Sequence, residues 1–295
     1  MARHYRYYLG RITKGGVLTT EEVVEAIMKP VTIHKNKYSY TFANMSFDKE
    51  NNYVFGKLVK FLPEGEVETI EPVKHEESSV FIPHKIQSSS PFIIVLDYMG
   101  IAYPTVWNEL TEEQFEVNFC ELIKAKYDDF FVDCKIEAVV DLRTFVDRLS
   151  SMDRIDKIKA TVMPPNPLFG PVWEDLKEYM ERRKTGEVSI SEKAKTEDGL
   201  MTNIKTIMNS FFESKENIVD DTPKSYDISD AALLMAADGY GHAKVEGKSD
   251  GGILVIKTKD NQKSFQFDKT PDIEEFFTLV KSKFEAINSE RDLQH

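Results

Sequence analysis

The sequence has 295 residues, of which 41% are hydrophobic and 30% are charged, and its formal net charge is −12 at pH 7. This composition indicates folded domains with a sizeable core and excludes a generally disordered chain. The apolar run at residues 92–96 is too short to cross a bilayer. Two cysteines, Cys120 and Cys134, and the lack of a secretory signal at the N-terminus predict a cytoplasmic protein.

The first third of the chain predicts a mostly antiparallel sheet. A helix is expected from the capping box formed by Thr19 and Glu22 to about Met28. Within residues 91–104, two strands are expected on either side of a turn near Gly100, and the second strand ends at Pro104. The period-2 patterns predict strands over residues 4–12, 31–36, 38–46, 53–62, 66–71, 79–83 and 92–104.

The rest of the chain alternates between helical and strand patterns. Helices are predicted from Thr111 and over 143–151, 171–183, 199–213, 229–237 and 272–288, and strands over 130–140, 155–163, 240–246, 252–258 and 262–267. The polar segment 214–227 has the composition of a linker. We predict an α+β fold with an N-terminal β-rich domain, a mixed αβ middle domain and a C-terminal hairpin sheet flanked by helices 199–213 and 272–288. The three sections cover residues 1–110, 111–213 and 228–290.

Basic residues are concentrated at the start of this acidic chain. The first 62 residues hold ten Lys or Arg against five Asp or Glu, together with ten aromatic residues. Cations neutralise phosphates and aromatic rings stack on bases, so this segment is a candidate nucleic-acid contact. The alternative is that the aromatic rings fill the core of a sheet. The candidate binding residues are Arg3, Arg6, Arg11, Lys35, Lys57 and Lys60.

A second candidate site lies on strand 130–140. Asp133, Lys135 and Glu137 share its polar face, and Asp97 ends an earlier apolar strand. Restriction-type nucleases use carboxylates to hold Mg²⁺ and a lysine to steady the attacking water. The same alternation is also typical of the solvated face of a half-buried strand. The six histidines show no metal-binding spacing, so outside the nuclease hypothesis we expect neither a metal nor a cofactor.

Three segments carry a family resemblance. They are PFIIVLDYMGIAYP at 91–104, VDCKIEAVVDLRTFVDRLSSMDRIDKIKATVMPPNP at 132–167, and PVWEDLKEYMERR at 171–183. Their order of elements resembles the RexA phage-exclusion proteins, a set of poorly characterised bacterial antiphage-defence proteins and, more distantly, the KwaB proteins of the Kiwa system. The resemblance implies a cytosolic, non-enzymatic oligomer that contacts DNA and acts in phage defence or exclusion.

Together, the charge asymmetry and the resemblance favour a non-catalytic nucleic-acid-sensing or regulatory component of a bacterial phage-defence or exclusion system. Its expected partners are DNA or RNA, a phage protein or a membrane effector, and further copies of itself in a homo-oligomer. Two alternatives stay open. One is the metal-dependent nuclease built on Asp97, Asp133 and Lys135, and the other is an acidic protein–protein interaction or inhibitor module.

Overall fold

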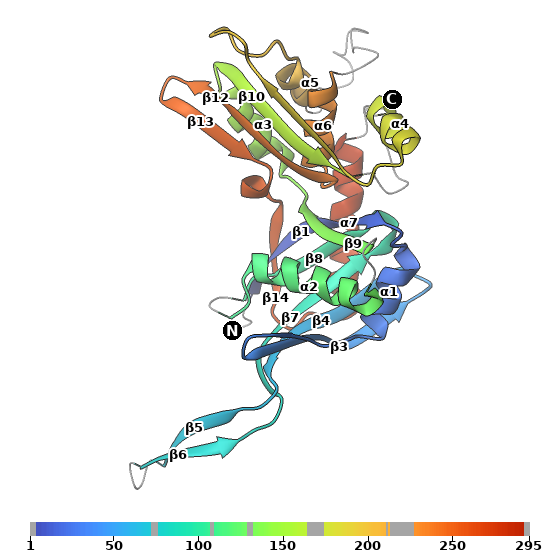
Figure 1. The fold of residues 1–295 in the computed structure, drawn as a ribbon, viewed down its shortest axis with the longest axis vertical. Coiled ribbons are helices and arrows are strands. Elements are labelled where there is room, and N and C mark those ends of the chain that lie inside the picture. Colours follow the sequence, from blue (N-terminus) through green and yellow to red (C-terminus); the bar gives the residue numbers. More distant parts are fainter. Residues whose placement is uncertain are drawn as a thin grey trace.

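The computed structural model describes residues 4–71, 76–106, 109–128, 132–163, 174–210, 212 and 227–291. Arg3 and nearly all of the predicted linker 214–227 lie outside these ranges. The described chain forms two packed units, one above the other in Figure 1, and each is built on an antiparallel sheet. The predicted α+β class is therefore confirmed.

An eight-stranded sheet forms the N-terminal unit. Its strand order is β14-β1-β8-β7-β4-β3-β2, and β9 also pairs with β1 beyond the end of β14. The strands are β1 (His4–Gly16), β2 (Ile33–Lys35), β3 (Tyr38–Asp48), β4 (Tyr53–Leu62), β7 (Lys85–Val95), β8 (Gly100–Pro104), β9 (Val132–Ala138) and β14 (Ser264–Asp268). From β2 to β8 the sheet is the predicted meander, interrupted by a hairpin of β5 (Glu66–Glu71) and β6 (Glu76–Phe81) that projects away from it.

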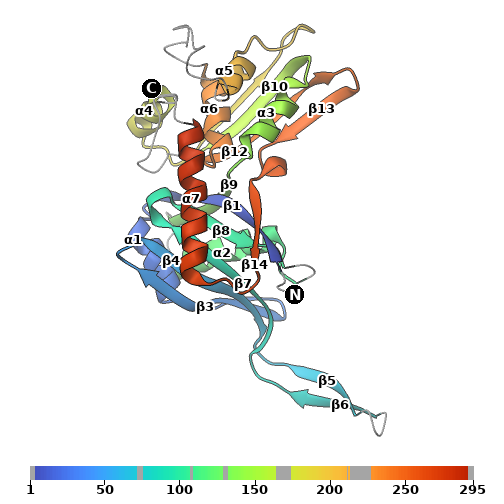
Figure 2. The ribbon, with the colours of Figure 1, turned by 180° about the vertical axis from the view of Figure 1, so that it is seen from behind.

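Helices cover both faces of this sheet. On one face lie α1 (Thr20–Met28) and α2 (Glu112–Tyr127), whose apolar residues share a core with Ile12, Phe42 and Phe92. Both helices begin at the predicted threonines, Thr19 and Thr111, each with a complete capping box. The opposite face is covered by the long helix α7 (Ile273–Arg291), which Figure 2 shows running along the sheet.

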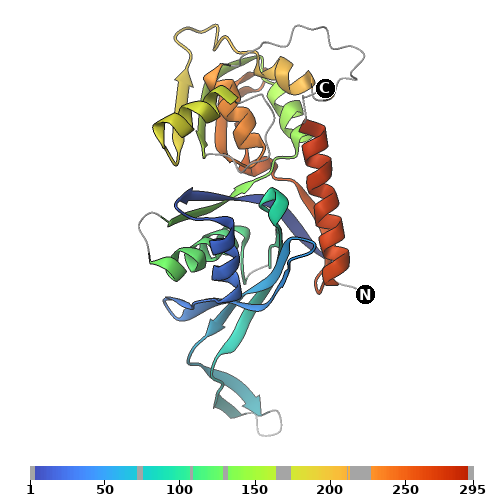
Figure 3. The ribbon, with the colours of Figure 1, turned by 90° about the vertical axis from the view of Figure 1, so that its right-hand side faces the viewer.

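The second unit contains a four-stranded sheet with the order β11-β10-β12-β13. Its strands are β10 (Arg154–Val162), β11 (Val188–Lys193), β12 (Gly241–Ser249) and β13 (Gly252–Lys257). One face packs against α3 (Leu142–Ser150), α4 (Glu174–Arg183), α5 (Ile204–Ser210) and α6 (Ile228–Ala237) in a single hydrophobic core. Figure 3 shows these helices gathered on that side. Within the described parts of the chain, no helix of this unit packs on the other face.

Two predictions about the C-terminal region are wrong. The strand expected at 262–267 was assigned to the hairpin sheet, but β14 pairs with β1 in the N-terminal unit. The helix expected at 272–288 was placed beside the same hairpin sheet, yet α7 packs on the N-terminal sheet. The reason is an aromatic cluster in which the Tyr7 ring lies 5.6 Å from that of Phe265 and 4.9 Å from that of Phe276. Contacts between residues so distant in sequence leave no local pattern.

The hydrophobic cores also divide the chain differently from the three predicted sections. Helix α2 and strand β9, from the predicted middle domain, belong to the N-terminal core. The elements from α3 to β13 form the second core, so this unit is inserted between β9 and β14. None of the described helices is both long and apolar enough to span a membrane.

Candidate functional site

The structure does not gather the predicted N-terminal cations into one patch. Arg6 is exposed on β1, on the sheet face that carries Tyr8. Lys57 of β4 is half-buried and alternates onto the opposite face, the one that carries Phe55 and α7. Lys60 lies on the α2 side of β4, and its Nζ is 4.2 Å from the centre of the Tyr38 ring. The expectation of a single N-terminal binding surface is therefore wrong.

Internal contacts account for three of the predicted binding residues. Arg11 is 1% exposed and makes hydrogen bonds within the protein, so it cannot contact a ligand on the surface. Lys35 forms an ion pair with Glu121 of α2. Lys60 donates to the carbonyl oxygen of Glu109 at 3.1 Å. The aromatic residues of this segment, among them Tyr7 and Phe55, are buried in the cores as the alternative interpretation predicted.

The residues of the nuclease hypothesis do not converge either. Asp97 is exposed after β7 and accepts a hydrogen bond from Asn52, whereas Asp133 pairs with Lys124 at 2.5 Å. Burial acts to raise the pKa of Asp133, but the contact with Lys124 outweighs it and lowers that pKa. In the part of the chain that the structure describes, no group of three or more His, Cys, Asp or Glu side chains could hold a metal ion. The Mg²⁺ site expected from the sequence is therefore not formed by these residues.

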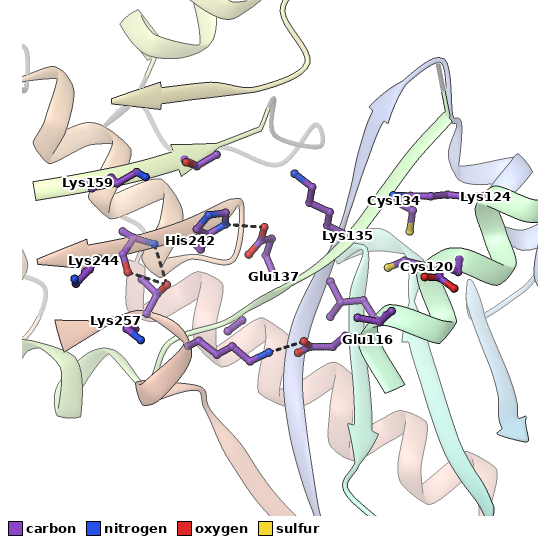
Figure 4. A pocket seen from close by; sticks show the side chains of 18 residues that line it. Glu116, Cys120, Lys124, Cys134, Lys135, Glu137, Lys159, His242, Lys244 and Lys257 are labelled. Carbon is purple, nitrogen blue, oxygen red and sulfur yellow. Dashed lines mark hydrogen bonds and ion pairs between the residues drawn. The ribbon is translucent and has the colours of Figure 1, made fainter. Parts of the chain in front are cut away.

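Lys135 and Glu137 from that hypothesis do line a cavity, which lies between the two units and has a volume of about 630 Å³. One wall comes from α2 and β9 of the N-terminal unit, and the other from β10, β12, β13 and the short helix η4 (Lys259–Asn261). Figure 4 shows lysines of the second unit facing α2 across this space. The lining holds six lysines and His242 but three glutamates.

The cationic wall of the cavity continues into the helix-free face of the second sheet. Strand alternation places basic residues on this face of every strand, and Glu246 lies among them. Arg154, opposite Lys248, also belongs to this face and pairs with Asp156 at 2.9 Å. We call this surface the lysine face and define it by Lys157, Lys159, Lys193, Lys244, Lys248 and Lys257.

Three lysines of this face form one row across three neighbouring strands. Lys159 of β10 lies opposite Lys244 of β12, which in turn lies opposite Lys257 of β13. Like charges in directly opposite positions of a sheet are destabilising. Lys244 is paired with Glu246 at 2.7 Å, while Lys159 and Lys257 are exposed and form no ion pair with any described residue. A costly row of cations in an acidic protein indicates a binding surface for an anion.

His242 lies beside this row, two residues before Lys244 on the same face of β12 and opposite Thr161. Its Nδ1 lies 3.2 Å from Oε1 of Glu137, whose side chain is 10% exposed, while the His242 side chain is 58% exposed. The hydrogen bond to Glu137 raises the pKa of His242 above its ordinary value, although partial burial opposes the shift. Glu137 therefore favours a charged imidazole at the edge of the lysine face.

The opposite wall contains neutralised acids and the two cysteines. Glu116 of α2 accepts from the Tyr103 hydroxyl at 2.6 Å and pairs with Lys259 at 2.6 Å. Cys120 and Cys134 are both buried at this wall, and Figure 4 shows their sulfur atoms directed towards each other. The hydrogen bond with Cys134, together with burial, raises the pKa of the Cys120 thiol well above its usual range. Such a thiol is a weak nucleophile.

Sequence analysis missed the lysine face, although a local signal exists. Lysine alternates with apolar or small residues in KIKATV of β10 and HAKVEGK of β12, and ILVIK of β13 ends in a lysine. Each pattern alone is that of any half-exposed strand. The row forms because β10 pairs with β12, about 85 residues later in the chain, and that register is invisible in either segment.

Comparison with protein-family models places the chain in a family. A family model with the description "Domain of unknown function (DUF4747)" matches residues 21–217, which run from α1 through α5. No curated protein matches the chain. The matched region includes Lys157, Lys159 and Lys193 of the lysine face, whereas β12 and β13 follow it. Because the match covers more than half of the sequence, the chain belongs to the DUF4747 family.

Proposed function

We propose that this protein is a non-catalytic nucleic-acid-binding component of a bacterial phage-defence or exclusion system, and that the lysine face is its contact surface. The observation that carries the binding proposal is the concentration of six lysines and Arg154 on an open sheet face, where Glu246 and Asp156 are the neighbouring acids, in a chain of net charge −12. A local cationic surface on an acidic protein attracts phosphates without promoting binding elsewhere on the molecule. The resemblance to phage-exclusion proteins is the support for the cellular role.

The chemistry of the lysine face favours phosphates over bases. Its described positions carry Lys, Arg, Ser, Thr, His, Glu, Val and Ile, and none is Phe, Tyr or Trp. Stacking platforms for single-stranded nucleic acids need aromatic rings, and Arg154, the guanidinium on this face, is engaged by Asp156 at 2.9 Å. We therefore expect binding that depends strongly on salt and weakly on sequence.

The acidic interaction module, the remaining alternative, is less well supported. It would be favoured by a negative surface with no positive patch to match it, whereas the lysine face is such a patch. The lining of the cavity has the same sign, with cations in excess of acids. The proposal of a nucleic-acid contact thus moves from the N-terminal segment to the second unit.

The proposal is tested by fluorescence anisotropy with a labelled 20-nucleotide single strand and a 20-base-pair duplex, each at several salt concentrations. Changing Lys159, Lys244 and Lys257 together to glutamine should reduce the slope of log affinity against log salt on the duplex by roughly 3. The matched control changes Lys37, Lys49 and Lys269, three exposed lysines outside the lysine face, and should leave the slope within error.

Two results would reject this assignment. One is an absence of salt-sensitive binding by the unmodified protein at micromolar concentration. The other is an equal loss of affinity in the control variant, because that would indicate a general charge effect and no defined surface.

A further inference from the structure

We infer that the cavity between the two units binds a nucleoside 5′-phosphate, with its phosphate on the lysine row and its nucleoside against the α2–β9 wall. The inference rests on the proposed function in one respect, since both use the affinity of the same lysines for phosphate. It goes further by assigning a small-molecule ligand to a site that a nucleic acid lying across the open sheet face would not fill.

The size and shape of the cavity suit a small molecule. Its volume of about 630 Å³ lies within the range of roughly 300–1,000 Å³ that is typical of ligand pockets. It also lies at the boundary of two packed units, which is a frequent position for such pockets. A mononucleotide is small enough to enter it, whereas a duplex can contact only its rim.

The two walls differ in polarity in the way that a nucleotide requires. One wall presents Lys159, His242 and Lys244, whereas the other presents the apolar side chains of Val117 and Ile136. Val117 is 44% exposed at the middle of α2, so its side chain is available to a ligand in the cavity. A phosphate would thus meet cations while a base or ribose covers apolar surface.

The acids at the cavity do not cancel this preference. Glu137 is bonded to His242, Glu116 to Lys259 and the Tyr103 hydroxyl, and Glu121 to Lys35. Because the bond to Glu137 occupies Nδ1 of His242, the Nε2 atom remains for a ligand, and it donates a charge-assisted hydrogen bond to phosphate when the ring is protonated.

The first test is calorimetric titration of the full chain with AMP, CMP, GMP and UMP, and separately with inorganic phosphate and the four nucleosides. At least one nucleotide should bind ten times more tightly than both inorganic phosphate and its own nucleoside. Val117→Phe places a ring in the cavity and should weaken that nucleotide at least tenfold. The control is Val17→Phe, because Val17 is 58% exposed and does not line the cavity.

The second test locates the phosphate. Lys159→Gln, which removes an exposed cation from the cavity wall, should weaken the tightest nucleotide at least fivefold and leave binding of its nucleoside unchanged. Equal binding of that nucleotide by Lys159→Gln and by the unmodified protein would overturn the placement of the phosphate. Binding of every nucleotide no tighter than inorganic phosphate, or an unaffected Val117→Phe variant, would overturn the inference as a whole.

Failure of this inference and failure of the proposed function give different results. Val117→Phe should bind the duplex as well as the unmodified protein does, because the lysine face is intact in it. If the duplex binds and no nucleotide does, the inference falls and the proposed function stands. If nucleotides bind and nucleic acids do not, the cavity assignment stands and the proposed function falls.

Discussion

Arg11 on the N-terminal sheet donates from Nε to the carbonyl oxygen of Asp238 at 2.8 Å, and Asp238 ends helix α6 of the second unit. The same guanidinium donates from Nη1 to the Tyr98 carbonyl and from Nη2 to Asn288 of α7. Its carbon lies 4.9 Å from the centre of the Tyr240 ring. One buried cation therefore connects both units and α7. The sequence shows Arg11 only as one cation of a basic segment, because its partners lie far away in the chain.

Replacement of Arg11 should reduce the stability of the whole protein. Arg11→Met leaves the Asp238 side chain and two carbonyl groups without this donor, and we expect a loss of about 3 kcal/mol in the free energy of unfolding. Urea denaturation followed by circular dichroism measures it. Arg6→Met, an exposed arginine on the same strand, should change stability by less than about 0.5 kcal/mol. Equal effects of the two changes would contradict the role assigned to Arg11.

Glu112 predicts a pH dependence of stability. Burial, with a contribution from Glu116, raises the pKa of Glu112 to about 7. Between its ordinary value near 4.5 and about 7, the folded protein retains a proton that the unfolded chain releases. Stability contributed by this proton is therefore lost as the pH rises through that window.

Glu112→Gln should remove this dependence. At pH 8 the variant should be more stable than the unmodified protein by about 1 kcal/mol, a figure reduced for the partial exposure of the side chain, and at pH 4.5 the two should be equal. Glu113→Gln is the matched control, since it also removes an acid from the first turn of α2. Thermal denaturation across this pH range measures the effect. If the stability of Glu112→Gln and that of the unmodified protein change with pH in parallel, Glu112 is not the group responsible.

His242 should make nucleic-acid binding depend on pH. The bond to Glu137 raises its pKa, and Lys135, Glu187, Lys159 and Lys244 are the other charged groups around it. As the pH falls through that raised pKa, the lysine face gains one positive charge. We expect affinity for the duplex to rise about fivefold from pH 8.5 to pH 6.0 at fixed salt. Anisotropy titrations of His242→Gln should give a flat profile, and an unchanged profile would exclude His242 from the contact.

Gly100 at the start of β8 sets how closely α7 approaches the sheet. A Cβ atom at this position would overlap the ring of Phe284. Phe284 belongs to α7 and is fully buried in the core between this helix and the sheet. Gly100→Ala should therefore destabilise the protein by about 2 kcal/mol through overpacking. Gly251→Ala, in the open turn between β12 and β13, is the control and should be close to neutral. Chemical denaturation of both variants decides the matter, and two neutral results would count against tight packing of α7.

The elements that could be predicted from the sequence are those specified by neighbouring residues. Helices α1 and α2 begin where they were expected, because a capping box is made by residues three positions apart. The strand pattern of β9 likewise placed Cys134 on an apolar face and Glu137 on a polar one.

Partners across the chain could not be predicted in the same way. Nothing within residues 262–267 distinguishes a third strand of the local hairpin from a partner of β1, because both positions require the same alternating side chains. Contacts such as the stacking of Tyr7 on Phe265 favour the pairing with β1, and these two residues are about 260 positions apart in the sequence.

The candidate site shows the same limit. The sequence shows which segments of the chain are rich in basic residues. Whether those residues form a common surface depends on which strands lie side by side in a sheet. Lys159 and Lys244 form part of a cationic surface only because the pairing of β10 with β12 places them opposite each other. Conversely, Arg11 looked like a surface cation until its buried partner Asp238 was in place.

The pairing of β1 with β14 has a consequence for synthesis of the protein. A ribosome makes β1 first, but Ser264, where β14 begins, is added more than 240 residues after the end of β1. During that time one edge of the first strand has no permanent neighbour over residues 4–8, and the inserted unit can already complete its own core. The N-terminal sheet closes last, so a nascent chain that stalls before Ser264 leaves an aromatic-rich edge open to aggregation or to capture by a chaperone.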